Sequence, residues 1–255
     1  MSSEIEFKFE TMTSRGNAFG EGKWDADLDQ SVRDSQSNAD LVIVIRIYFD
    51  KIQRGGANWE DGQFERFKRL VLASAQRFWD KAFWLKTPSN YDGLNWPDEK
   101  PTHRCNVNCR LKLIDTVHPV DAHCSIAAYR VMDIEPDFPQ SSHHFSSRVM
   151  DAVQRIPRSN MVQLPHIHEV GHWLGLGHVR ARDITAPGAN DDAAYGIKLS
   201  EMEDLMGRGM VRHKWHSGPW QEAAATITGT RKGDWGVSMG PIQPVLLPRH
   251  AIARR

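Results

Sequence analysis

The sequence has no excess of charge of either sign, since its 32 lysine and arginine residues equal its 32 aspartate and glutamate residues. A balanced chain has no electrostatic attraction for nucleic acid or for an anionic membrane. It also has no apolar run long enough to cross a bilayer, and its start, MSSEIEFKFE, lacks the hydrophobic stretch of a secretory signal. We therefore expect a monomer without nucleic-acid partners or a membrane span, which is cytoplasmic or exported by a route that needs no such signal.

Cysteine is scarce as well. The three residues Cys105, Cys109 and Cys124 are an odd number and too few for a disulfide scaffold. Their spacing matches no zinc-binding template well. We interpret them as thiols in neighbouring strands, and a Cys105–Cys109 disulfide or a second metal site are the alternatives.

Hydrophobic patterning predicts an α/β (α+β) fold. A nearly continuous apolar run predicts a buried strand at 41–50, and apolar residues at steps of three and four predict an amphipathic helix from about 63 to 85. Further expected elements are strands at 107–116 and 125–133, a weaker strand at 146–153, a helix beginning at Pro165, a loop over 179–204 and a helix at 219–228. This order predicts a mixed twisted sheet with two long helices in an N-terminal lobe, followed by an irregular C-terminal lobe with a late helix.

The chain has no internal repeat and no clear linker, and we therefore expect one domain. Residues 1–40 are polar and are interpreted as an N-terminal extension with a short edge strand at 4–9. Residues 41–255 then form the domain itself, whose N-terminal lobe spans 41–178 and whose C-terminal lobe spans 179–255.

Imidazoles are crowded in the stretch HIHEVGHWLGLGH. On a helix, His168 and His172 project from one face one turn apart, so both can bind one metal ion. Glu169 flanks such an ion rather than binding it, and is well placed to take a proton from a water molecule that the metal activates. Gly175 can adopt the left-handed conformation that ends a helix, which turns the chain back and makes His178 the third ligand.

Gly177 and His166 belong to the same stretch, but neither is expected to bind the metal. Gly177 loosens the turn that follows the helix. His166 lies near the helix start, away from the metal face, and is expected at the surface or around the ligands. A catalytic zinc usually has three protein ligands and one open position, so the pattern predicts Zn²⁺ as the cofactor.

Residues 168–178, H-E-V-G-H-W-L-G-L-G-H, resemble the long zinc signature of the metzincin clan of zinc endopeptidases at every defined position. The resemblance implies a Zn²⁺ ion held by the three histidines at the floor of a flat cleft, with Glu169 as the general base of peptide-bond hydrolysis. Clan members also carry a methionine in a tight turn beneath the metal. Met206 in EDLMGRG fits that position, and Met210 is the second candidate.

The chain departs from the clan in two respects. The stretch between His178 and Met206 is longer than in compact members such as matrix metalloproteases. Some relatives use a tyrosine two residues after the methionine to stabilise the transition state, whereas this chain has Arg208 there. Tyr195 and Arg208 are the candidates for that charge stabilisation in this chain.

Clan members are commonly held inactive by an N-terminal segment that places a cysteine or an aspartate on the zinc. The candidates in this chain are Asp25, Asp27, Asp29 and Asp34. A carboxylate can occupy an open zinc position, but we favour the interpretation that this stretch is a solvated acidic loop.

The resemblance predicts a zinc metalloendopeptidase whose protein or peptide substrate lies extended along an exposed strand edge, at 125–133 or 146–153. A zinc hydrolase of a non-peptide substrate is one alternative, because three histidines and a glutamate are compatible with such an enzyme too. A non-catalytic zinc-binding protein is the other, although a structural zinc needs a fourth protein ligand and the sequence offers none nearby.

Overall fold

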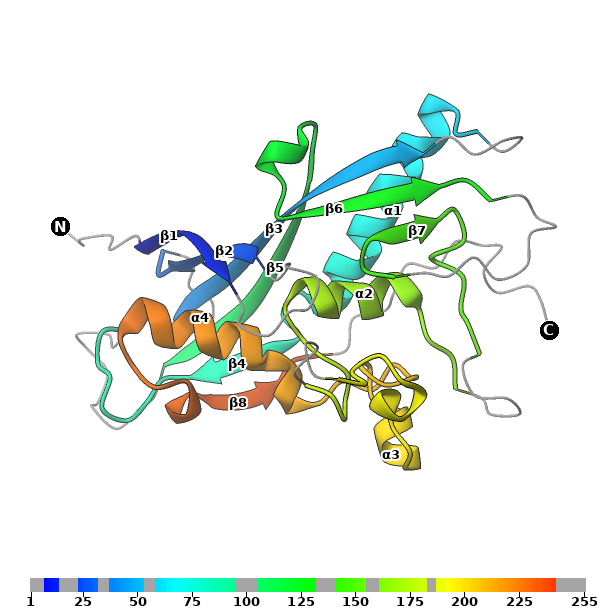
Figure 1. The fold of residues 1–255 in the computed structure, drawn as a ribbon. Coiled ribbons are helices and arrows are strands. Elements are labelled where there is room, and N and C mark those ends of the chain that lie inside the picture. Colours follow the sequence, from blue (N-terminus) through cyan, green and yellow to red (C-terminus); the bar gives the residue numbers. More distant parts are fainter. Residues whose placement is uncertain are drawn as a thin grey trace.

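The computed structural model describes residues 7–13, 23–31, 37–52, 58–94, 105–131, 141–154, 161–182 and 187–241. Within these residues, eight strands form one mixed sheet (Figure 1). In chain order they are β1 (Phe7–Thr13), β2 (Lys23–Asp29), β3 (Ala39–Ile52), β4 (Phe83–Lys86), β5 (Asn106–Thr116), β6 (Cys124–Tyr129), β7 (His144–Ser146) and β8 (Gly236–Met239). Their order in the sheet is β1-β2-β3-β5-β4-β8, with β6 paired to β3 and β7 paired to β6.

The long strand β3 is the centre of the sheet. It runs parallel to β5 and β6 and antiparallel to β2. Ile47 and Tyr48 pair with both β5 and β6, so these two strands lie on opposite edges of β3, and β6 continues the edge that β2 begins. The strands predicted at 41–50 and 107–116 are confirmed, and the one predicted at 125–133 is confirmed but shorter.

The core lies between one face of the sheet and the helices. Every second side chain of β3 is buried on that face, namely Leu41, Ile43, Ile45, Ile47 and Phe49. Helix α1 (Asp61–Trp79) packs on β5, α2 (Pro165–Trp173) packs on α1, and α4 (Gly218–Thr228) contacts β1, β2 and β3. The rings of Trp79 in α1 and Trp220 in α4 stack with their centroids 6.4 Å apart, which joins these helices in one core.

The predicted mixed α/β fold and the late helix are confirmed, but α2 has only nine residues and is not a long helix. The predicted loop at 179–204 contains two short helical segments, η2 (Asp192–Tyr195) and α3 (Leu199–Met202). The other short turns are η1 (Pro119–Asp121), η3 (Lys214–Ser217) and η4 (Lys232–Asp234). None of the helices in the described ranges has the length and apolar character needed to cross a membrane.

Helix α1 ends at Trp79, so the helix predicted over 63–85 is too long at its end. Asp80 leaves the helix in an extended conformation, with φ −66° and ψ 131°, and its carboxylate accepts the N–H of Leu111 in β5 at 3.1 Å. Lys81 then adopts a positive φ of 55° and donates its N–H to β5. The apolar residues that follow do not continue the helix. They form β4, which pairs antiparallel with β5.

The strand predicted at 146–153 is wrong. β7 ends at Ser146, and the chain turns at once, with the N–H of Val149 donating to the Ser146 carbonyl at 3.0 Å. Val153 alone pairs again in this stretch, in an isolated bridge to Gln163. Val149 and Met150 are buried from the turn, so their apolar character reflects core packing and not a strand.

Residues 23–29 belong to the sheet and do not form a solvated loop. β2 pairs with β3, and its alternate residues Trp24, Ala26 and Leu28 are buried. Asp25 forms an ion pair with Arg46 of β3. The predicted acidic loop is therefore wrong for these residues, while Asp34 lies outside the described ones. The edge strand predicted at 4–9 is present from its fourth residue onward, as β1.

Candidate metal centre

Helix α2 positions the first two histidines of the site. Pro165 is its first residue, where a missing N–H costs no helical hydrogen bond. The helix ends at Trp173, and Gly175 follows with a φ of 90°, in the left-handed region that favours glycine. The N–H of Gly175 donates to the carbonyl of His172 at 2.8 Å, and the chain then turns back toward the helix. The predicted start, end and glycine turn of this helix are confirmed.

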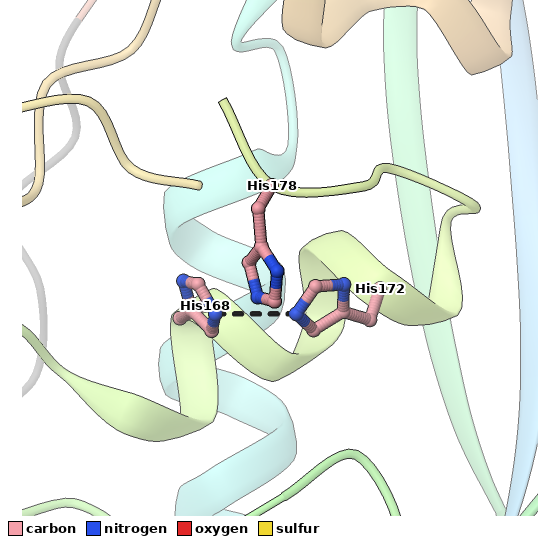
Figure 2. Close-up of side chains that lie close together, drawn as sticks. All are labelled: His168, His172 and His178. Carbon is pink, nitrogen blue, oxygen red and sulfur yellow. Dashed lines mark hydrogen bonds between the residues drawn. The ribbon is translucent and has the colours of Figure 1, made fainter. Parts of the chain in front are cut away.

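His168, His172 and His178 converge in a buried group (Figure 2). One ligand atom of each ring lies within 4.8 Å of the others, and the Nε2 atoms of His168 and His172 are 3.2 Å apart. In Figure 2 the first two rings come from α2, and His178 enters from the returning chain. Each of the three residues is at most 5% exposed. The group is therefore compatible with a bound metal ion.

The Nδ1 atom of each of these imidazoles faces a backbone carbonyl. The carbonyls belong to Leu205, Leu176 and Ala189 for His168, His172 and His178 in turn, at 2.8, 2.8 and 2.7 Å. A carbonyl oxygen only accepts hydrogen bonds, so each Nδ1 carries the proton and each Nε2 presents a lone pair. Among the described residues, the buried Nε2 of His178 has no hydrogen-bond partner. A metal ion satisfies a lone pair of this kind, and the carbonyl on Nδ1 holds the ring in place for it.

Burial favours the neutral form of His172 and His178. It lowers the pKa of His172 well below its usual range, and the neighbouring His168 and His178 act in the same direction. Burial also lowers the pKa of His178. Neutral imidazole is the form that binds a metal ion. The three residues therefore fit a metal ion in geometry, and His172 and His178 fit it in protonation state as well.

Glu169 follows His168 in α2 and is buried, with 6% of its surface exposed. Its carboxylate is not one of the three converging ligand atoms. A carboxylate that lies beside a metal group without belonging to it is available for proton transfer. That role for Glu169 stays a prediction.

The segment around Met206 packs directly against α2. Met206 is fully buried, and a Cβ atom on Gly171 would collide with its Sδ atom, so a larger residue in the helix would force the Met206 side chain to shift. Met210 lies elsewhere, with its Sδ atom 3.4 Å from the N–H nitrogen of Leu164, just before α2. Of the two methionines considered for the turn beneath the metal, Met206 is the one that touches the helix between the histidines.

Tyr195 and Arg208 have different surroundings. The ring centroid of Tyr195 lies 3.8 Å from that of His178 and 6.0 Å from that of His168. The guanidinium of Arg208 instead donates to the carbonyl of Asp192 at 3.1 Å and forms an ion pair with its carboxylate. The structure thus brings Tyr195 to the histidine group and holds Arg208 against the start of η2.

His166 is not at the surface, so the first of its two expected places is wrong. It is fully buried, with Nε2 2.9 Å from the hydroxyl of Ser74 in α1 and Nδ1 3.3 Å from the carbonyl of Val149. Burial lowers the pKa of His166 to about 4. The reason is that all nine residues of α2 are buried, so no face of the helix reaches solvent.

The three cysteines are buried, and none of them forms a disulfide. Cys109 lies in β5, Cys124 begins β6, and both strands flank β3. The Cys105 thiol donates to the carbonyl of Leu94 at 2.7 Å. The interpretation as separate thiols in neighbouring strands is confirmed, and the described residues contain no disulfide and no second metal-binding group.

Two buried polar residues beside the histidine group escaped the sequence analysis. Gln163 donates from Nε2 to the carbonyl of Gly207 at 3.0 Å and lies 3.1 Å from Nδ1 of His168. The carboxylate of Asp204 accepts the N–H of Met206 at 2.7 Å. An aspartate that binds the N–H two residues ahead is a common turn arrangement, which is the one local signal available for Asp204. Nothing near Gln163 in the sequence indicates its role.

Comparisons with known protein families, with curated proteins and with solved structures found no match to this chain. A function is therefore inferred from the chemistry of the site itself. That chemistry consists of the three converging imidazoles, the buried Glu169 and the residues packed around them.

Proposed function

We propose that this protein is a zinc-dependent endopeptidase that works as the metzincins do. The observation that carries the proposal is the Nε2 atom of His178, which is buried beside two other imidazoles and has no hydrogen-bond partner among the described residues. Three imidazoles with one open position are the ligand set of a catalytic zinc. A structural zinc needs a fourth protein ligand, and the converging group in the described chain has three residues.

The positions of the side chains suggest a separate catalytic role for each of them. A zinc ion held by the three histidines would supply a Lewis acid that polarises a carbonyl group and makes a water molecule more acidic. Glu169 accepts a proton from the attacking water and then donates a proton to the leaving amine nitrogen. Tyr195, whose ring lies against His178, donates its hydroxyl to the oxygen that becomes negative in the transition state.

The proposed substrate is a protein or peptide in extended conformation. β7 pairs with β6 alone among the described strands, but on its outer side His144 exchanges both backbone hydrogen bonds with Ser141, and the Ser146 carbonyl accepts the N–H of Val149. An extended peptide would have to displace these bonds to pair with β7. The same segment is tied to the histidine helix, because Trp173 donates from its indole to the Ser142 carbonyl at 2.9 Å and stacks on Phe145. Of the two stretches considered in the sequence, 125–133 contains most of β6, which pairs with both β3 and β7, and 146–153 contains only the last residue of β7.

The test is metal content and proteolysis, measured on the same purified protein. We expect about one zinc per chain, and cleavage of unfolded casein that stops when a chelator is added and returns with zinc. His168→Ala and His172→Ala should lose both properties. The control is His118→Ala, which changes an exposed histidine outside the group.

Each other outcome has a clear meaning. Protein that was never exposed to chelator and contains no zinc contradicts the metal centre. Protein that binds zinc and does not cleave casein contradicts the peptidase and favours a non-catalytic zinc protein or a hydrolase of another substrate.

A further inference from the structure

Residues 204–207 form a turn that touches the surroundings of all three histidines. The carbonyl of Leu205 accepts the Nδ1–H of His168 at 2.8 Å. The Sδ atom of Met206 packs on Gly171, the residue before His172. The carbonyl of Met206 accepts the N–H of Val179, the residue after His178, at 3.2 Å. A shift of this turn would therefore disturb every ligand of the proposed metal ion.

The carboxylate of Asp204 holds that turn from within the core. Asp204 is 2% exposed, and its Oδ1 accepts both the N–H of Met206 at 2.7 Å and Nε2 of His216 at 2.9 Å. Its Oδ2 accepts the indole N–H of Trp215 at 3.0 Å. A buried carboxylate with three donors is fixed in orientation, because losing any one donor leaves charge without a partner.

The proton positions in this network follow from its acceptors. The N–H of His213 donates to Nδ1 of His216 at 2.9 Å, so neutral His216 carries its proton on Nε2 and donates it to Asp204. Burial opposes ionisation of Asp204, but the hydrogen bonds from His216, Met206 and Trp215 outweigh it and lower the pKa of Asp204. Asp204 is therefore an ionised acceptor that needs no proton of its own.

We propose that Asp204 is a positioning residue for the metal centre, since its carboxylate fixes the 204–207 turn and so orients His168 through the Leu205 carbonyl. Groups that hold a metal-binding histidine by its second ring nitrogen set its orientation and its basicity. Asp204 does not contact His168 through its carboxylate in this scheme. It holds the backbone of the 204–207 turn, which supplies the Leu205 carbonyl that His168 binds. The inference rests on the proposed metal binding and concerns affinity for the metal.

The experiment compares two buried carboxylates of this chain. Asp204→Asn keeps one oxygen acceptor and places its amide NH2 either against the indole N–H of Trp215 or against the donors of Met206 and His216, so at least one donor loses its acceptor. Asp40→Asn is the matched control, because Asp40 is 3% exposed and accepts bonds from Asn108 and Arg110 within the sheet. For each protein one measures zinc affinity by competition with a chromogenic chelator, the absorption spectrum of the Co²⁺ form, and thermal unfolding without metal.

We expect Asp204→Asn to weaken zinc binding by about 10–100-fold and to change the Co²⁺ spectrum. Asp40→Asn should lower the melting temperature and leave zinc affinity and spectrum as in wild type. Trp215→Phe removes a single donor to Asp204 and keeps an aromatic ring, so a smaller loss of affinity is expected. It supplies the test if Asp204→Asn does not fold.

Three results would overturn the inference. If Asp204→Asn keeps the zinc affinity and the Co²⁺ spectrum of wild type, Asp204 has no positioning role, although the protein still binds the metal. If Asp204→Asn does not fold, the same result in Trp215→Phe has the same meaning. An equal loss of affinity in Asp40→Asn would assign the effect to general destabilisation. Wild-type protein that binds no zinc would overturn the metal centre and this inference with it.

Discussion

At the scale of single residues, the proposed function assigns metal binding and proton transfer to different side chains. The three histidines have their Nδ1–H groups on backbone carbonyls, so their Nε2 lone pairs face one place. Glu169 lies beside them on α2 and does not belong to the converging group. Metal binding and hydrolysis are therefore expected to respond to different mutations.

Glu169→Ala is expected to keep the metal and the fold while hydrolysis is lost. Because Glu169 is assigned proton transfer and not coordination, zinc content should equal that of wild type. The kcat/KM for casein should fall by about 10²–10⁴-fold. The control is Glu65→Ala, an exposed carboxylate in α1. Near wild-type turnover in Glu169→Ala would mean that another group accepts the proton.

Tyr195→Phe removes a hydroxyl and keeps the ring that lies against His178. If the hydroxyl stabilises the transition state, kcat should fall by about 10²–10³-fold while KM and zinc content change little. Arg208→Ala is the matched variant, because its guanidinium is bonded to Asp192, and its kcat should stay near the wild-type value. Steady-state kinetics on a fluorogenic peptide measures both. If kcat falls in Arg208→Ala and not in Tyr195→Phe, Arg208 is the residue that stabilises the transition state.

At the scale of elements, β2 supports both the sheet and the loop between the histidines. Its pairing covers one edge of β3, and its buried residues extend the core. Trp24 of β2 lines the same cavity as residues 174–177, which connect α2 to His178. β2 is therefore a structural neighbour of the chain segment that leads to His178.

Removal of β2 is expected to destabilise the protein. Deleting residues 1–38 exposes an edge of β3 and part of the core, so the melting temperature should fall well below that of the full chain. The milder Trp24→Ala should cost about 3–5 kcal/mol of unfolding free energy, because a fully buried indole leaves a cavity. Urea unfolding measures this, with the exposed Val120→Ala as the control. A truncated protein with unchanged stability would contradict the role of β2.

At the scale of the whole molecule, buried histidines make stability depend on pH in one direction. Burial lowers the pKa of His166, His172, His178 and His216 in the folded state. In the unfolded chain these groups titrate near ~6.5. The unfolded state therefore binds more protons below that pH, and the unfolding free energy falls as the pH falls.

His166 allows a quantitative test, because its pKa is lowered to about 4 from 6.5. Its contribution is fully present above about pH 6.5 and is lost progressively toward pH 4, which amounts to about 3 kcal/mol. His166→Asn should be less stable at neutral pH but should show a shallower fall over this range. Urea unfolding of metal-free protein between pH 4 and 8 checks this. An equal slope in the variant and in wild type would contradict the buried neutral state of His166.

The sequence by itself determined those features that depend on neighbouring residues. The spacing of His168 and His172 places both on one face of any helix, and Gly175 permits the left-handed turn wherever the helix packs. The apolar run at 41–50 likewise predicts a buried strand without reference to its partners. These predictions held because the period of a helix or strand and the allowed φ angles are local properties of the chain.

The tertiary structure alone decided where α1 ends, that β2 joins the sheet, and which groups surround the histidines. Asp80 leaves α1 because its carboxylate binds a strand 31 residues further along the chain. His166 meets Ser74 across 92 residues, and Gln163 meets Gly207 across 44. Contacts between residues so distant leave no period in the sequence, because buried polar groups take the partners that packing brings within reach.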